Sequence, residues 1–184
     1  MRRAWWLLLL LTACTGAGES FRGTEVTGVA WGGDFTLTAH TGNALDTRTL
    51  AGKPQVLFFG FTHCPDICSP ALTRLGQTLQ ALGTDAASVQ VLFITVDPEH
   101  DRPEVLARFL GGFQPGIVGL TGTAATLERV RREYHVAAEK QAGGNIAHSG
   151  MVFVRDGAGK LRLIHREDFA PADLAHDLRL LLRR

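Results

Sequence analysis

The strongest constraint on the fold is an apolar run over residues 55–61 that leads directly into a segment with two cysteines. A short run with no polar residue after its first position is typical of a β-strand that is buried on both faces. After Cys64 and Cys68, leucines recur at helical spacing, at Leu72, Leu75, Leu79 and Leu82. The sequence therefore predicts a buried strand that delivers a pair of cysteines onto the N-terminus of a helix.

Strand and helix patterns alternate along the remaining chain. Further strands are expected at residues 89–96, 117–120, 151–154 and 161–164, and further helices around residues 101–113, 127–134 and 171–182. Near the N-terminus, Phe35–Thr38 and a short run that reaches Leu45 flank Thr41-Gly42-Asn43, which predicts a hairpin. This order predicts an α/β protein with a mixed central sheet, flanked by helices and preceded by an N-terminal hairpin. A buried strand that carries cysteines to a helix is the thioredoxin-like arrangement, so we expect that fold.

Capping signals suggest where two of the helices begin. Asp101, with Glu104 three residues later, has the form of a capping box, and Pro103 suits a first helical turn. In the same way, Cys64 is expected to cap the helix after the cysteines, with Pro65 in its first position. The two cysteines would then lie one turn apart on one helical face, with their Cα atoms about 6 Å apart.

The N-terminus has the pattern of an export signal. Arg2 and Arg3 precede an apolar run that ends at Leu11, which is far shorter than the roughly 20 residues of a membrane span. The segment Leu11-Thr12-Ala13-Cys14 resembles the lipobox of bacterial lipoproteins, which implies cleavage before Cys14 and lipidation of its sulfur. An uncleaved anchor with an incidental cysteine is the alternative. We expect a signal peptide over residues 1–13, a flexible tether over residues 14–24 and one domain over residues 25–184.

Composition narrows the compartment and the partners. Two of the 19 basic residues lie within residues 1–13, so the remaining chain carries 17 basic residues against 18 acidic ones. A nearly neutral protein offers no electrostatic footprint for nucleic acid, and no such partner is expected. Three cysteines leave an odd thiol in an exported protein, and lipidation of Cys14 leaves a single pair. We expect an extracytoplasmic protein of the bacterial cell envelope, attached to the membrane through its lipid anchor.

The Cys64–Cys68 pair suits two kinds of chemistry. A helix N-terminus favours the thiolate, which both metal binding and disulfide exchange require. Thiolates together with an imidazole suit copper, whereas zinc normally takes a fourth protein ligand. A disulfide that only staples the helix is disfavoured, because so small a loop removes little entropy from the unfolded chain. Spacing alone does not choose between metal and redox chemistry.

A family resemblance adds to this interpretation. The segment Gly60-Phe-Thr-His-Cys-Pro-Asp-Ile-Cys68 closely resembles the signature of the SCO/SenC proteins. Three further segments occur in that family's order, namely Ile94–Glu99, Gly119–Thr123 and His148–Gly150. The resemblance covers roughly residues 30–180. It implies a thioredoxin-fold copper chaperone that helps to assemble the dinuclear copper centre of cytochrome c oxidase.

The resemblance also implies the ligands and the partners. It assigns copper, as Cu(I) or Cu(II), to Cys64, Cys68 and His148, with cysteines that cycle between dithiol and disulfide. The implied partners are the copper-site subunit of the oxidase and other copper chaperones. The chain departs from the family at Ser69, where proline is usual, at Ala147, where many members have an acidic residue, and in the short, glycine-rich loop at residues 141–145 that precedes His148. We expect such departures to change affinity or redox potential without removing a ligand.

Other side chains near these positions are weaker candidates. His63, which adjoins Cys64, and Asp66, which lies between the cysteines, are candidates to tune the ligands without binding the metal. Met151 is expected to pack rather than to bind metal. The remaining histidines are interpreted as turn or surface residues: His40, His100, His135, His165 and His176.

The predicted function is therefore that of a copper metallochaperone, and whether the chain is an enzyme stays open. The main alternative is a thiol–disulfide reductase that keeps cysteines of the oxidase subunit reduced, with Cys64 and Cys68 as its redox pair. Against a general oxidoreductase, no proline lies between Pro115 and Pro171, where thioredoxins place a cis-proline. A peroxidase is disfavoured because Thr62 precedes Cys64 by two residues instead of three. Copper sensing is a third interpretation.

Overall fold

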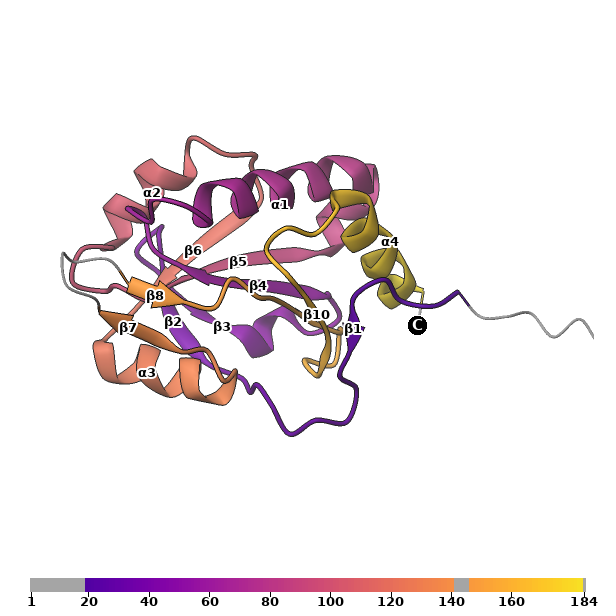
Figure 1. Cartoon of the computed structure of the whole chain (residues 1–184), viewed down its shortest axis with the longest axis horizontal. Helices are drawn as coiled ribbons and strands as arrows, with labels where there is room; N and C mark the ends of the chain where they lie inside the picture. Colours follow the sequence, from indigo (N-terminus) through magenta and orange to yellow (C-terminus); the bar gives the residue numbers. More distant parts are fainter. Residues whose placement is uncertain (1–18, 141–145, 184) are drawn as a thin grey trace, which may run out of the picture.

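The centre of the molecule is an eight-stranded mixed sheet, seen in a computed structural model that describes residues 19–140 and 146–183 (Figure 1). The strand order is β1-β10-β9-β4-β5-β6-β2-β3, and β7 and β8 form a separate two-stranded sheet. In chain order the elements are β1 (Thr24–Glu25), β2 (Thr36–Ala39), β3 (Ala44–Asp46), η1 (Thr47–Leu50), β4 (Gln55–Gly60), α1 (Cys68–Leu82), η2 (Gly83–Ser88), β5 (Gln90–Thr95), α2 (Pro103–Leu110), β6 (Ile117–Thr121), α3 (Ala124–Glu133), β7 (Ala138–Lys140), β8 (Ile146–His148), β9 (Val152–Arg155), β10 (Leu161–His165) and α4 (Pro171–Leu182). The predicted α/β class with a mixed sheet flanked by helices is confirmed.

Three parallel strands form the middle of the sheet. β4 pairs with β5 over its whole length, from Gln55 opposite Gln90 to Gly60 opposite Thr95, and β5 pairs with β6. Every residue of β4 is buried, as the apolar run predicts. Because the carboxyl ends of parallel strands lie at the same edge of a sheet, the loops after β4 and β5 come together there.

Antiparallel strands extend the sheet on both sides of this middle. β9 pairs with β4, β10 pairs with β9, and β1 completes that edge. On the other side β2 pairs with β6 and forms the predicted N-terminal hairpin with β3. Gly42 in the hairpin turn has φ +87°, a conformation that glycine adopts without the steric cost of a Cβ atom.

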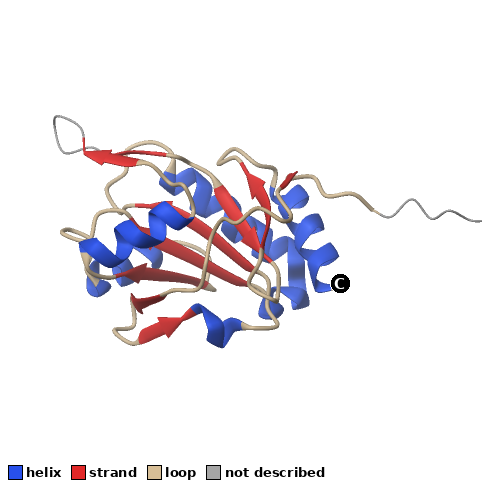
Figure 2. Cartoon of the chain, turned by 90° about the horizontal axis from the view of Figure 1, so that it is seen from below, coloured by secondary structure: helices blue, strands red, loops and turns tan. Residues whose placement is uncertain are grey.

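Helices cover both faces of the sheet, so that the molecule has three layers. In Figure 1, α1, α2 and α4 lie above the sheet and α3 lies below it, on the side that faces the viewer in Figure 2. Residues of β4 alternate between the two layers. Val56 and Phe58 pack with α1 and α4, while Leu57 and Phe59 pack with α3.

Both expected helix starts differ from the structure. The helix after the cysteines begins at Cys68 with Ile67 as its N-cap, a turn later than predicted, and Pro70 lies in its first turn, where backbone amides have no partner within the helix. Ahead of α2, the N-cap is Arg102 instead of Asp101, so the helix begins one residue later than predicted, and Pro103 lies in its first turn as expected. The Asp101 side chain is buried and accepts hydrogen bonds from Thr62 and Thr95 instead.

The segment before β1 is tied to the domain. Backbone amides of Arg22 and Gly23 each donate a hydrogen bond of 2.8 Å to the carboxylate of Asp177 on α4. Nε2 of His165 lies 3.0 Å from the same carboxylate, and both side chains are buried. His165 is therefore a core residue and not the surface histidine that the sequence suggested. Arg22 to Thr24, assigned above to the tether, lie against the folded domain.

Several predicted features lie outside the described residues. These are the signal peptide, Cys14, most of the tether, and the glycine-rich loop at residues 141–145. Among the described residues, none of the helices combines the length and the apolar character that crossing a membrane requires.

Candidate metal centre

The two cysteines lie where the loop after β4 leads into α1. β4 ends at Gly60, a tight turn follows, the Cys64 amide donates to the Phe61 carbonyl at 3.3 Å, and α1 begins at Cys68. The prediction that both cysteines lie one turn apart within a helix is therefore wrong. Cys64 lies in the loop, and Cys68 is the first residue of the helix. They are in the dithiol form.

Cys68 is the inner cysteine. Its side chain has no exposed surface, and its sulfur faces the backbone of Gly60, where a Cβ atom would come within 2.7 Å of it. Only a glycine leaves room for the sulfur at this depth. Cys64 is partly buried and packs against the apolar clusters of both layers. The pair thus joins an enclosed sulfur to one that reaches the surface.

Burial raises the pKa of the Cys68 thiol well above its usual value. A hydrogen bond from the Phe61 backbone opposes this shift, whereas a hydrogen bond with the Cys64 side chain and the charge of Asp101 add to it. The expected lowering of the thiol pKa at the helix N-terminus is not found for Cys68, where burial is the largest cause and raises the pKa. The contact between the two side chains brings the sulfurs close enough to act on one ion or to be oxidised together.

Asp101 fixes the loop that carries the cysteines. Its carboxylate is completely buried and accepts hydrogen bonds from the Thr62 amide at 3.0 Å, the Thr62 hydroxyl at 2.6 Å and the Thr95 hydroxyl at 2.6 Å. Thr62 belongs to the loop after β4, whereas Thr95 ends β5. One carboxylate therefore joins the segments that follow two adjacent parallel strands.

The backbone of His148 ends β8, opposite Ala138 of β7. Ile146 at the start of β8 is buried in the same layer as α3. The side chain of His148 lies outside the described residues, so its assignment as the third ligand stays a prediction. Met151 follows three residues later. The sequence suggested that it packs, but it is 43% exposed.

The two residues expected to tune the ligands occupy different environments. Asp66 is exposed. His63 packs its ring on Phe61, with centroids 4.9 Å apart, and places Nε2 3.4 Å from Asp97. His100, interpreted above as a background histidine, also contacts Asp97. His63 is thus directed toward the turn after β5.

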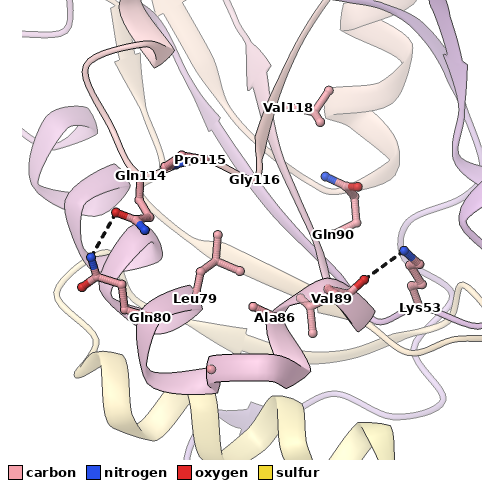
Figure 3. Close-up of a pocket in the computed structure, with 12 residues that line it drawn as sticks. Lys53, Leu79, Gln80, Ala86, Val89, Gln90, Gln114, Pro115, Gly116 and Val118 are labelled. Carbon is pink, nitrogen blue, oxygen red and sulfur yellow. Dashed lines mark hydrogen bonds between the residues drawn. The ribbon is translucent and has the colours of Figure 1, made fainter.

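A surface hollow elsewhere on the domain has no part in this site. It is lined by Leu79, Gln80, Ala86, Val89 and Gln114, among others, with a hydrogen bond between the Gln80 and Gln114 side chains (Figure 3). Gln90, the first residue of β5, also lines the hollow. The hollow lies at the amino ends of the parallel strands, whereas the cysteines follow their carboxyl ends.

A dithiol placed after the central strand of this sheet defines a thiol-bearing protein with the thioredoxin-like fold. The sequence profile of the SCO1/SenC family matches residues 24–183, and the chain belongs to that family.

Solved structures of the family resemble this chain closely. ScoI of Bradyrhizobium japonicum, solved with copper bound, is 36% identical with a TM-score of 0.77, and the match covers 83% of this chain and 100% of that one. Apo Sco1 of Thermus thermophilus is 31% identical with a TM-score of 0.77, covering 91% and 100%. The predicted thioredoxin-like fold is confirmed.

Among relatives of known sequence, the SCO2-like protein of Rickettsia felis is 30% identical over 154 residues, or 80% of this chain and 75% of that protein. The mitochondrial SCO2 homologue of Danio rerio is 45% identical over 108 residues, or 58% of this chain. That match spans about two fifths, 39%, of the Danio rerio protein.

Three residues that shape the site were not predicted from the sequence. Gly60 stands within the quoted signature, but only the position of the Cys68 sulfur shows why it is glycine. Asp97 and Asp101 are both buried, and the pattern Asp-Pro-Glu-His-Asp reads as a polar turn. Two acids directly behind a buried strand were the available signal, since buried carboxylates require partners.

Proposed function

We propose that this chain is a copper-binding metallochaperone of the cell envelope that delivers copper to the dinuclear copper site of cytochrome c oxidase. The observation that carries the proposal is the contact between the Cys64 and Cys68 side chains, one of them enclosed against Gly60. Thiol sulfur is a soft donor that suits Cu(I), and two sulfurs in contact supply two of its ligands. Copper-bound structures of family members support this choice of metal.

His148 completes the proposed ligand set. Copper held by Cys64, Cys68 and His148 would have two thiolates and one imidazole, a set that accommodates Cu(I) in three-coordination and leaves Cu(II) room for a further ligand. Because Cys64 is partly exposed, a partner can reach the metal from that side. A transfer protein needs such access, since the ion must leave again.

The location forms part of the proposal. Residues 1–13 would be removed as a signal peptide, and a lipid on Cys14 would hold the domain at the membrane through the segment before Glu19. Incorporation of labelled fatty acid into the wild-type chain, and its loss in Cys14→Ser, is the expected result. Unchanged labelling of Cys14→Ser would contradict the anchor.

The test of copper binding is a titration of the purified, reduced chain with Cu(I) and Cu(II), followed by absorption spectroscopy. We expect stoichiometric binding and a thiolate-to-Cu(II) charge-transfer band that is lost in Cys64→Ser and in Cys68→Ser. His148→Ala is expected to weaken binding by roughly tenfold or more. His176→Asn, on α4, is the matched control and should bind as the wild type does. Wild-type affinity in His148→Ala would show that the third ligand is wrong.

A second candidate function rests on the same contact between the sulfurs. As a reductase, the dithiol would give two electrons and two protons to a disulfide of the partner, so that Cys64 and Cys68 become joined while the partner regains two thiols. Weak copper binding together with ready exchange with an oxidised oxidase fragment would favour this function over the chaperone.

A further inference from the structure

A cluster of two histidines and one aspartate lies beside the cysteine loop. Nδ1 of His100 is 2.7 Å from Oδ2 of Asp97, and Nε2 of His63 is 3.4 Å from the same oxygen. The two imidazole rings are 5.2 Å apart between centroids. One potential ligand atom from each residue lies within 4.8 Å of the others. The three donors therefore converge on one small volume.

The carboxylate in this cluster is buried and incompletely satisfied. The Asp97 side chain is 2% exposed, and within the part of the chain that the structure describes its Oδ1 has no hydrogen-bond partner. Buried carboxylate oxygens are normally paired or bound to a metal, because removing them from water is costly. Both histidines contact Oδ2 of this carboxylate, and its orphaned Oδ1 leaves the buried acid one partner short, which points to a missing ligand.

The surrounding backbone holds the acid in place. The Asp97 amide donates to the Thr95 hydroxyl at 2.9 Å, and the Asp97 carbonyl accepts from the Asp101 amide at 2.9 Å. By contrast, the histidines have room to adjust, since the His63 side chain is 46% exposed and the His100 side chain 66%. Donors around an ion at about 2.1 Å lie about 3.4 Å apart in a tetrahedron, so modest rotations of the imidazoles suffice.

We propose that His63, Asp97 and His100 form a second metal site that takes a divalent transition-metal ion. Two imidazoles and a carboxylate suit Cu(II), Zn(II) and Ni(II) rather than the softer Cu(I), and Cu(II) binds such sets most tightly. The fixed Asp97 carboxylate and the two imidazoles would each supply one ligand to the ion. Because both histidine side chains are exposed, water or a ligand from a partner could complete the coordination.

The second site does not depend on the function proposed above. None of its donors is a thiol, and none is His148. It can therefore be tested in Cys64→Ser/Cys68→Ser/His148→Ala, a triple variant that lacks every ligand of the proposed copper site but keeps the cluster.

The experiment is a calorimetric titration of the triple variant with Zn(II) and with Cu(II), followed by electron paramagnetic resonance of the Cu(II) form. We expect one equivalent of either ion, bound more tightly as Cu(II), with hyperfine splitting from two nitrogen ligands. Adding His100→Asn or His63→Asn should weaken binding by roughly tenfold or more and remove one nitrogen from the spectrum. Adding His176→Asn should change neither.

A stoichiometric site that survives both His63→Asn and His100→Asn, or the absence of binding in the folded triple variant, would overturn the proposal. If the triple variant does not unfold cooperatively, the comparison moves to the chain with its native cysteines. There, His100→Asn should bind one equivalent of Zn(II) less than His176→Asn. Equal stoichiometry in those two variants would mean that the cluster is only a hydrogen-bonded group.

Discussion

The sulfur of Cys68 lies so close to Gly60 that a Cβ atom at position 60 would stand 2.7 Å from it. The same atom would stand 2.8 Å from the ring of Phe93, which is fully buried. Gly60 therefore determines how deeply the Cys68 thiol is buried, because a side chain at position 60 would displace the sulfur.

Gly60→Ala should accordingly affect both the stability of the fold and the metal site. Overpacking of this kind costs about 1–3 kcal/mol in unfolding free energy, and relief requires the Cys68 sulfur to move. Urea denaturation and Cu(I) titration measure the two effects. Gly112→Ala is the control, because the nearest atom to its new Cβ is the Phe109 carbonyl oxygen at 3.5 Å. Wild-type values for both quantities in Gly60→Ala would contradict the fit described above.

Removal of the Thr62 hydroxyl should loosen the cysteine loop. Thr62→Val keeps the shape of the side chain but leaves the buried Asp101 carboxylate with one donor fewer, which costs about 1–3 kcal/mol. Thr62→Ser keeps the donor and should behave nearly as the wild type does. Denaturation curves report the loss, and alkylation of the cysteines should be faster in the valine variant. Identical alkylation rates in the two variants would mean that Asp101 does not restrain the loop.

The buried Asp177 makes stability depend on pH in acid. Burial tends to raise the pKa of its carboxyl, but hydrogen bonds from His165, Arg22 and Gly23 outweigh burial and hold the pKa below the usual 3.8. A carboxyl with a lowered pKa stabilises the fold fully above its unfolded pKa, and this contribution disappears as the pH falls through the folded pKa. The loss is therefore expected below about pH 4.

Urea midpoints measured between pH 7 and pH 2.5 test this dependence on Asp177. Asp177→Asn should be less stable than the wild type at pH 7, and the difference should shrink below about pH 4. Asp168→Asn, in which the lost acid is exposed, should run parallel to the wild type. A constant gap between Asp177→Asn and the wild type at all pH values would disprove the titration of Asp177.

Arg155 should be the most sensitive charged residue of the sheet. Its guanidinium is almost fully buried and donates to the Gly159 carbonyl, the Gln55 side chain and the Asp34 carboxylate, at 2.8, 2.9 and 2.5 Å. The Asp34 carboxyl, whose pKa this hydrogen bond lowers, is half exposed and can turn to water. The Gln55 side chain is buried and cannot turn to water. Arg155→Met should therefore lower the free energy of unfolding by about 3 kcal/mol, measured by denaturation. Arg162→Met, at a more exposed position of the next strand, should cost less.

The larger elements could be predicted because their patterns are strong. The strand at β4 is apolar throughout, the helices carry leucines at regular spacing, and the hairpin has a turn sequence. Short strands without such patterns were missed, since β1 has only Thr24 and Glu25 and owes its place to pairing with β10. Pairing between distant segments leaves no local signal in one sequence.

The helix starts show where local rules fail. Cys64 and Asp101 each stand before residues that suit a helix start. However, the Asp101 side chain bonds to Thr62, and Cys64 packs against the apolar core, so neither caps a helix. Pro65 and Pro70 each fit a first turn, and spacing alone does not decide between them. The cysteine pair could be found from the sequence, whereas the carboxylates behind β5 required the structure, because burial made them important.

Asp101 also couples the segments that follow β4 and β5. Because its carboxylate accepts from donors at the ends of both β4 and β5, opening either end leaves a buried carboxylate with fewer donors and so weakens the restraint on the other end. The two loops thus form one cooperative unit of local unfolding, and their backbone amides should exchange hydrogen with the same opening free energy. The cysteine loop and the segment after β5 that carries Asp97 and His100 would then become ordered or disordered together.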